Sequence, residues 1–499
     1  MEPVLDSTRD SLGGGASELP QLAASPSLFK RAWRVLLDFW IAPIRAEPLA
    51  LMRIVTALGV LLSALTTIAP NLSLFWFDEG IIPAQVSDQM MSYGSRASIL
   101  YGVTSHAAII AWFVLWMIAL LFLLVGCYSR IACIIAWVLA VSFNIRGLWT
   151  LNGGDDVAVH LLFYLMLSPC GAAWSIDSLR RRLKTYRDPE SGFELPQARP
   201  TAQPTLIEPW SVRLMLIQLV IMYLLNGINK MNLAQTNDYL TGEAVYWALN
   251  DATLTRFAFD MLPAPMWVCR LLSWATLLFE FSFVIFICLP RVRPVLLWAG
   301  VLFHAGILAT MEIGWFGQFT LCYYPVFISG AAVAGAAALL ARRGSKKKYV
   351  VCFDTFCPVC RRSKFALELF DVGKRLTYLD IHDRPAMEAA LPGVGYTRAL
   401  REMLVIAPSG KVTGGFDAFR TVMRVLPALW ILLPVLYLPG AVWIGRRIYK
   451  AVARNRYKLV KCDQGVCNLH LMALSRENLD EEEIARVVQG ARDAAMQRT

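Results

Sequence analysis

Two cysteines three positions apart are the residues of this chain best suited to chemistry. They lie in the sequence Cys357-Pro358-Val359-Cys360. A thiolate attacks disulfides and binds metals, so the reactivity of such a pair depends on what lowers the thiol pKa. The start of a helix does so, because its free backbone N–H groups favour negative charge. We predict that Cys357 is a nucleophile at a helix start and that Cys360, one turn further on, is the resolving thiol.

The residues around the pair predict the elements that position it. Tyr349–Phe353 is a short apolar run typical of a buried strand, and Pro358 suits the first position of a helix that continues to about Phe370. Further on we expect a strand at Leu376–Ile381, a hairpin of Met403–Ala407 and Lys411–Gly414, and a helix at Phe416–Leu426. This order is the thioredoxin plan, and it predicts a small α/β thioredoxin-like domain.

Zinc binding is the competing interpretation of these cysteines. Cys462 and Cys467 form a second pair near the end of the chain. Four thiolates can hold one tetrahedral zinc ion, and Cys-x-x-Cys serves both redox and zinc chemistry. A third possibility is that the thiols are only structural. The sequence leaves these alternatives open, with Cys462 and Cys467 as secondary redox or metal candidates.

The segment from residue 349 to residue 467 resembles the DCC family of thiol-disulfide oxidoreductase-like proteins. The resemblance rests on Phe353–Cys360, on Gly414–Phe419, on Tyr449–Arg456 and on the two tail cysteines. It implies a protein-disulfide oxidoreductase that acts on a thiol or disulfide of a protein or small molecule. No proline immediately precedes Met403, where thioredoxins place the proline that docks substrate.

The rest of the chain has the composition of a membrane protein. Of its 499 residues, 57% are hydrophobic and 17% are charged, against about 25% charged in soluble proteins. Bilayer crossing takes roughly 20 apolar residues, and about eight stretches approach that length. They are Pro48–Ala69, Ala107–Cys127, Ile131–Leu148, Val157–Trp174, Val212–Ile228, Leu271–Leu289, Val295–Thr310 and Phe319–Leu340. We therefore expect a polytopic helical bundle followed by the small α/β domain.

Basic residues alternate between the connecting loops and predict the orientation. Arg180–Arg182 and Lys346–Lys348 lie in one set of loops, whereas the other set is nearly bare of Lys and Arg. The positive-inside rule places both termini in the cytoplasm, and an even number of spans requires the same. We expect an integral protein of a bacterial inner membrane. The net charge of +11 fits such loops, so nucleic acid is not an expected partner and the lipid bilayer is.

Several charged residues are expected at membrane depth, where they are costly and usually functional. The polar cluster that we single out comprises Arg146, Asp155, Asp156, Lys230, Glu280, His304 and Glu312. These residues could converge on an outward-facing cavity. The structural alternative is that Arg146 pairs with Asp155, and Lys230 with Glu312, as ion pairs at the interface.

Residues 30 to 342 resemble the HTTM proteins, the membrane family that includes vitamin K-dependent gamma-carboxylase. The resemblance rests on Phe75–Gly80, on Arg146 with Gly154-Asp155 and Ser175–Asp177, on Asn226–Lys230, and on His304 with Met311–Gly314. It implies quinol-driven carboxylation with Lys230 in the position of the base. The Asn-Asn-His turn of the carboxylase is Asn152-Gly153-Gly154-Asp155 in this chain, which also lacks the large lumenal domain.

Three functions follow from these patterns. The first is a membrane-anchored thiol-disulfide oxidoreductase; the second is a quinone-linked or carboxylase-like enzyme with an outward site around Lys230. The third is a non-catalytic maturation factor with zinc-binding or structural cysteines. No cofactor is firmly implied, but a quinone could serve the membrane site and zinc the cysteines.

The predicted organisation has five parts. These are a disordered cytoplasmic tail (1–27), the membrane domain (28–342), a basic linker (343–348), the thioredoxin-like domain (349–470) and a C-terminal amphipathic helix (471–499). Within the fourth part, the uncharged stretch Pro427–Gly445 is interrupted by prolines. We expect two short helices there, lying on the domain or on the bilayer surface, with a ninth span as the alternative.

Overall fold

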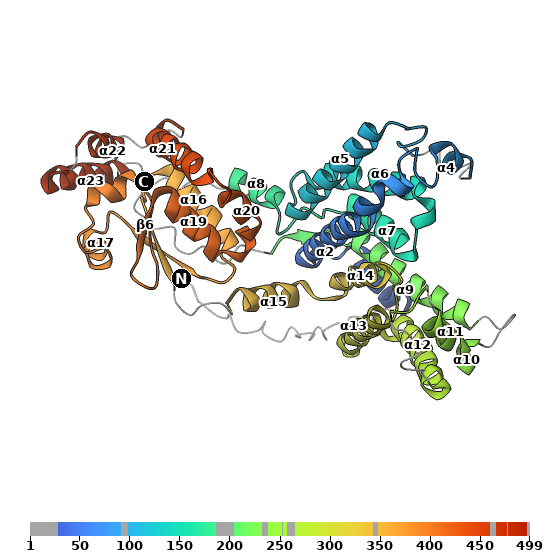
Figure 1. Cartoon of the computed structure of the whole chain (residues 1–499). Helices are drawn as coiled ribbons and strands as arrows, with labels where there is room; N and C mark the ends of the chain where they lie inside the picture. Colours follow the sequence, from blue (N-terminus) through green and yellow to red (C-terminus); the bar gives the residue numbers. More distant parts are fainter. Residues whose placement is uncertain are drawn as a thin grey trace, which may run out of the picture.

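The computed structural model describes residues 28–90, 98–185, 204–231, 238–251, 253–256, 265–342, 348–459, 466–476 and 478–496. They form a larger helical part and a smaller C-terminal part that contains a sheet (Figure 1). The predicted tail 1–27 and most of the linker 343–348 lie outside the described residues.

Six helices of the described residues are long and apolar enough to cross a membrane. They are α2 with its continuation through α3 (Glu47–Phe75), α5 (His106–Val125), α6 (Ser129–Arg146), α9 (Trp210–Lys230), α12 (Met266–Phe286) and α13 (Arg293–Thr310). Each coincides with a predicted span. The helical part is thus a membrane bundle, as expected.

The other two predicted spans have a different form. Helix α7 (Gly153–Leu167) has only 15 residues, because the chain turns extended at Ser168, before Pro169. The last apolar stretch is broken into α14 (Phe316–Leu321), a 3-10 turn and α15 (Gly330–Arg342), with a bend of 110° between the two halves. The described residues therefore hold six candidate spans, or seven if this bent pair is one span, against the prediction of about eight with an error of one.

Shorter elements complete the helical part. They are α1 (Leu28–Ile41), α4 (Ala84–Met90), α8 (Ile176–Thr185), α10 (Asp238–Thr241), α11 (Glu243–Asn250) and the small ribbon of β1 (Ile44–Arg45) with β2 (Leu206–Ile207). Arg53 of α2 is fully buried and donates hydrogen bonds to the carbonyl oxygens of Cys170 and Trp174. It thereby supplies hydrogen bonds to buried backbone carbonyls of the loop that follows α7.

The C-terminal part is built on a four-stranded sheet of order β4-β3-β5-β6. Strands β3 (Tyr349–Phe353) and β4 (Leu376–Asp380) are parallel, and β5 (Leu404–Ile406) and β6 (Val412–Gly414) are antiparallel to their neighbours. Its helices are α16 (Pro358–Phe370), α17 (Arg384–Ala390), α18 (Tyr396–Arg401), α19 (Gly415–Val425), α20 (Leu433–Leu436), α21 (Ala441–Leu459), α22 (Val466–Ser475) and α23 (Glu481–Met496). The expected strand, helix, strand, hairpin and helix are all present.

Helices cover both faces of this sheet, because neighbouring residues of a strand point to opposite sides. Val351 packs in a core with Val422 of α19 and Leu367 of α16. Cys352 packs in a second core with Leu400 of α18 and other residues of α17, α22 and α23. The result is a helix–sheet–helix arrangement in which α16 starts at the end of the central strand β3.

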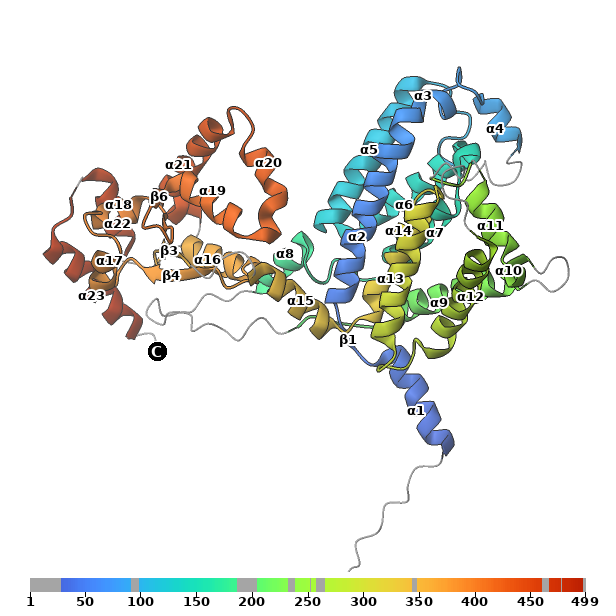
Figure 2. The ribbon, with the colours of Figure 1, turned by 60° about the horizontal axis from the view of Figure 1, so that its bottom comes forward.

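The stretch Pro427–Gly445 contains a 3-10 turn (Pro427–Leu432), α20 and the first turn of α21. No described helix in this stretch meets the length and hydropathy of a span, in keeping with the expectation of short helices. Helix α8 lies between α16 and the membrane bundle, so the two parts are side by side (Figure 2).

Candidate functional site

The two cysteines of the motif lie at the start of α16, as the sequence predicts. Cys357 is the residue before the first helical turn, with extended backbone angles, and Pro358 occupies the first turn. The Cys357 N–H donates to the carbonyl oxygen of Asp354 (3.2 Å), which closes the turn after β3. The Cys357 side chain is fully buried, whereas Cys360 is partly exposed and lines a large cleft.

The surroundings favour a thiolate at Cys357. The Cys360 side chain and backbone N–H hydrogen-bond to Cys357, and this lowers the pKa of the Cys357 thiol below its ordinary value. The positive charge of Arg456 acts in the same direction, whereas burial and the negative charge of Asp354 raise the pKa of Cys357. The shared proton and burial raise the pKa of Cys360 well above the ordinary thiol value. The two shifts run in opposite directions, so Cys357 is the thiol that ionises first and Cys360 is the proton donor of the pair.

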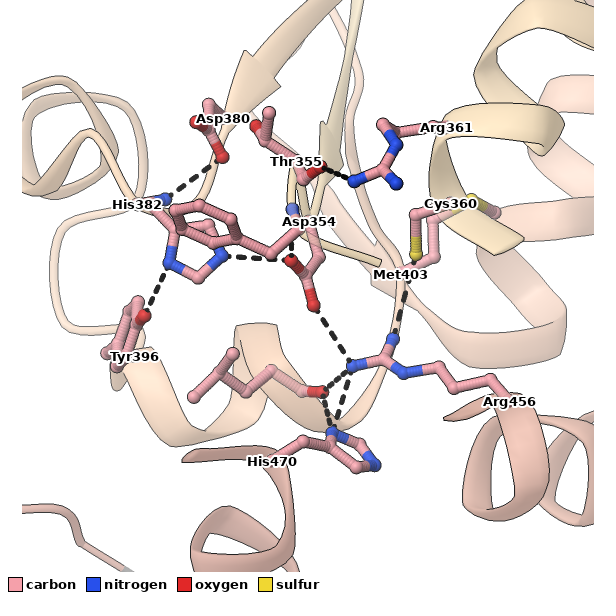
Figure 3. Close-up of polar contacts among 12 residues, drawn as sticks. Asp354, Thr355, Cys360, Arg361, Asp380, His382, Tyr396, Met403, Arg456 and His470 are labelled. Atoms are coloured by element: carbon pink, nitrogen blue, oxygen red, sulfur yellow. Dashed lines mark hydrogen bonds and ion pairs between the residues drawn. The ribbon is translucent and has the colours of Figure 1, made fainter. Parts of the chain in front are cut away.

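Arg456 of α21 connects the dithiol to the rest of the site (Figure 3). One guanidinium nitrogen lies 3.8 Å from the Cys360 sulfur, and the other donates to the carbonyl oxygen of Leu400 (2.6 Å). The second nitrogen also lies 3.6 Å from a carboxylate oxygen of Asp354. Arg456 and Asp354 are 6% and 2% exposed, so this is a buried pair of opposite charges beside the thiols.

A chain of hydrogen bonds holds the Asp354 carboxylate in place. Its Oδ1 accepts from the Phe356 N–H (3.0 Å) and lies 2.9 Å from Nε2 of His382. The other ring nitrogen of His382 is 2.8 Å from the hydroxyl of Tyr396. Burial raises the pKa of Tyr396, so its hydroxyl stays a donor and His382 can donate to the carboxylate.

His470 of α22 borders the guanidinium on its other side (Figure 3). Its Nδ1 lies 3.0 Å from Arg456. Burial first, and the nearby guanidinium second, lower the pKa of His470 to about 4. A neutral imidazole can accept a hydrogen bond from Arg456, whereas an imidazolium would repel it.

Sequence reasoning assigned no role to Asp354, His382, Tyr396, Arg456 or His470. Asp354 and Arg456 do lie inside the segments that carry the DCC resemblance, which is the signal that could have identified them. The other three come from separate helices and loops, and no spacing in the sequence connects them.

The second cysteine pair is not placed by the structure. Cys462 lies outside the described residues, and the side chain of Cys467 is not described. Among the side chains that the structure does describe, no group of three or more His, Cys, Asp or Glu residues could hold a metal ion. The four-thiolate zinc site therefore stays a prediction.

In the membrane part, the structure brings three of the seven polar residues together. Lys230 at the end of α9 forms an ion pair with Glu280 of α12, whose side chain is 2% exposed. His304 of α13 lines the same cavity of about 60 Å³. Its Nε2 lies 2.8 Å from the hydroxyl of Tyr223, which in turn lies 2.9 Å from the hydroxyl of Tyr324.

The other four residues lie elsewhere, and the two suggested ion pairs are wrong. Arg146 donates to the carbonyl oxygen of Trp76, while Asp155 caps the first turn of α7 by accepting from the Asn152 N–H. Asp156 is exposed in the same turn. Glu312 is exposed and lies 3.6 Å from Arg256. Local backbone groups and closer side chains supplied partners that the sequence pattern could not reveal.

Two family models match the chain in separate segments. The model of the HTTM domain matches residues 196–331, and the model of the DCC1-like thiol-disulfide oxidoreductase matches residues 351–462. This chain combines an HTTM domain with a DCC1-like domain. Both resemblances drawn from the sequence are thereby confirmed, in the predicted order. No curated protein and no solved structure gives a significant match.

The HTTM match begins at residue 196, after the loop Phe75–Gly80 and the helices α2 to α7 that carried part of the resemblance. It includes Lys230, Glu280 and His304. The DCC1-like match includes both cysteines of the motif together with Asp354, Arg456 and Cys462. The membrane site thus lies within its matched segment, and so does the C-terminal site except for His470.

Proposed function

We propose that the protein is a membrane-anchored thiol-disulfide oxidoreductase whose active dithiol is Cys357 and Cys360. The observation that carries the proposal is the position of Cys357 at the start of α16, hydrogen-bonded to the Cys360 side chain. The match to the DCC1-like thiol-disulfide oxidoreductase supports it. The helix–sheet–helix fold, with its reactive turn at the end of the central strand, supports a thioredoxin-like domain.

The order of steps in the exchange reaction follows from the opposite directions of the two pKa shifts. The Cys357 thiolate attacks one sulfur of a partner disulfide, forms a mixed disulfide and releases the other sulfur as a thiolate. Cys360 then attacks the Cys357 sulfur, the second partner thiolate leaves, and the Cys360 proton passes to a released thiolate. The products are a Cys357–Cys360 disulfide and a partner dithiol, and the reverse sequence oxidises a partner.

Exposure and thiolate character distinguish the two cysteines. Cys360 lines the cleft, whereas Cys357 is fully buried. We assign the attack to Cys357 because only the anion is nucleophilic. A partner sulfur can then reach Cys357 only if some of the groups that bury it move aside. We further propose that the domain lies in the cytoplasm of a bacterial cell with both termini inside, a position that the basic loops favour.

A redox titration of the full chain in detergent tests the proposal. After equilibration with mixtures of reduced and oxidised glutathione, peptide mapping should show a Cys357–Cys360 disulfide that forms and disappears reversibly. Cys352, buried in the same domain, is the internal control and should stay a thiol. A pair that stays reduced at every ratio, or zinc bound to the reduced pair, would contradict the proposal.

The membrane site supports a second candidate, proton-transfer chemistry in the HTTM domain. The observation behind it is the buried contact between Lys230 and Glu280 beside His304. The cavity of about 60 Å³ is smaller than the roughly 150 Å³ that holds benzene in an engineered protein. A quinone ring would therefore fit this cavity only if the surrounding helices moved apart. Loss of activity in Lys230→Ala, with both cysteines intact, would favour this candidate.

A further inference from the structure

The cleft that Cys360 lines is a large hollow between helices and has no assigned occupant. Its volume is about 1600 Å³, and most of its lining side chains are apolar. Typical small-molecule pockets have about 300–1000 Å³. The cleft could therefore hold a molecule larger than a typical small ligand. Its apolar lining could bury a hydrocarbon part of that molecule away from water.

One wall of the cleft is a stripe along α21 that ends at the dithiol. Ile444, Ile448 and Val452 are four residues apart, so they share one face of the helix, and Arg456 continues the same row. The three apolar residues are 52%, 59% and 45% exposed. From residue 444 to residue 456 the helix rises about 18 Å. The stripe is thus a long apolar path toward the Cys360 sulfur, which lies 3.8 Å from Arg456.

The facing walls come from both parts of the molecule. Helix α16 contributes Leu367 and Phe370, and α19 contributes Phe419. Membrane helices α2 and α5 contribute Ile54 and Leu124, near the ends that face the C-terminal part. Because two walls belong to helices that cross the bilayer, a molecule dissolved in the bilayer can enter the cleft without passing through water.

We infer that this cleft binds a bilayer-soluble molecule with a long hydrocarbon chain, whose head lies against Cys360 and Arg456. A hydrocarbon chain needs no hydrogen-bond partners, which suits walls made of apolar side chains on helices. An extended peptide would bring backbone N–H and C=O groups that these walls do not satisfy. The inference does not depend on the exchange reaction, because the apolar side chains that would bind the hydrocarbon are not the two thiols.

The hydrocarbon chain of the ligand could belong to a fatty acyl lipid or to an isoprenoid, and photolabelling distinguishes these two sources. Two probes are used on the full chain in detergent micelles: palmitate with a photoreactive group on its chain, and an isoprenoid alcohol with the same group. Adducts are mapped by mass spectrometry. Adducts on α16 and α21 with one probe or both, and their loss under excess unlabelled probe, are the expected results.

Matched variants locate the binding. Ile448→Glu places a charge in the apolar stripe and should lower the adduct yield on α16 about tenfold, since burying one such side chain contributes about that much. Leu471→Glu on α22 is the control, because Leu471 is equally exposed (61%) and lies outside the cleft lining. Ile448→Trp keeps an apolar surface but narrows the cleft at the stripe, so it should lower the yield without a buried charge.

Failure of this inference and failure of the exchange reaction can be told apart. Cys360→Ser should keep the photoadducts while it abolishes the redox change. Equal yields in wild type, Ile448→Glu and Ile448→Trp would overturn the inference. Competition by an apolar peptide but not by palmitate or the isoprenoid would overturn it as well, in favour of a protein partner.

Discussion

The two candidate sites both contain a pair of opposite charges with a buried carboxylate, but they differ in what the pair adjoins. In the membrane part Lys230 meets Glu280 beside a cavity of only about 60 Å³. In the C-terminal part Arg456 meets Asp354 next to a thiolate-forming cysteine and a cleft of about 1600 Å³. A buried ion pair by itself indicates only that two charges compensate each other. In the function that we propose, the thiols and the open cleft give the second pair a chemical task.

The comparison predicts that the membrane pair matters first for stability. Lys230→Met leaves the Glu280 carboxylate buried without its partner, which should destabilise the membrane part by about 3–5 kcal/mol. Thermal unfolding of the full chain in detergent measures the loss. Redox titration of the Cys357–Cys360 pair should stay unchanged.

A double variant provides the control for that prediction. Lys230→Met combined with Glu280→Met removes both charges and should recover most of the lost stability. Loss of a measurable activity in the double variant despite recovered stability would break the comparison, because it would give the membrane pair a chemical role.

Acid should weaken the C-terminal site through His470. Its pKa is about 4 in the folded chain, below the usual 6.5, so the folded state binds the proton less well than the unfolded state. The contribution of neutral His470 to the stability of the folded state is complete above pH 6.5 and is lost as the pH falls toward 4. This contribution is at most about 3 kcal/mol. The Tm of the C-terminal unfolding transition should fall in this range, and His470→Gln should remove that part of the pH dependence.

Arg456 should tune the reactivity of Cys357. Its positive charge helps lower the pKa of that thiol. In Arg456→Gln the alkylation rate of Cys357, followed by peptide mapping, should reach half its maximum at a higher pH than in wild type. Arg447→Gln is the matched control, since Arg447 lies on the same helix but is exposed and stacks on Trp443. An unchanged pH profile of alkylation in Arg456→Gln would show that the guanidinium does not affect the pKa of Cys357.

The smallest effect is expected at the outer end of the hydrogen-bond chain. Tyr396→Phe removes the hydroxyl that contacts His382 and should destabilise the C-terminal part by about 1 kcal/mol. Chemical denaturation measures the change. A clear shift in the pH profile of Cys357 alkylation in this variant would mean that these hydrogen bonds change the charge near the dithiol and do not only position Asp354.

The fold was more predictable from sequence than the site. The strand Tyr349–Phe353, the helix that starts at Pro358 and the hairpin are encoded by local patterns, and they appear within one or two residues of their predicted bounds. About eight spans were expected with an error of one, and the described residues hold six candidates, or seven with the bent pair, because local chemistry interrupts two apolar stretches. Pro169 follows the end of α7, and the bend between α14 and α15 breaks the last apolar stretch.

The partners of the charged residues could not be predicted, because they depend on which helices pack together. Glu280 was recognised as a buried charge, but Lys230 was assigned to Glu312 because both were expected at outward ends of spans. Arg456 is almost one hundred residues from Cys360 in the chain, and only the packing of α21 against α16 brings them together. A single sequence contains no periodicity that encodes such a contact.

The central claim is that Cys357 attacks disulfides and Cys360 resolves the product, and trapping in intact cells tests it most directly. Cys360→Ser should accumulate a covalent adduct on Cys357 that dithiothreitol releases and that disappears when Cys357→Ser is added. The adduct would also supply the partner for identification. An adduct that forms in Cys357→Ser but not in Cys360→Ser would reverse the two roles. No adduct in either variant would contradict the oxidoreductase account.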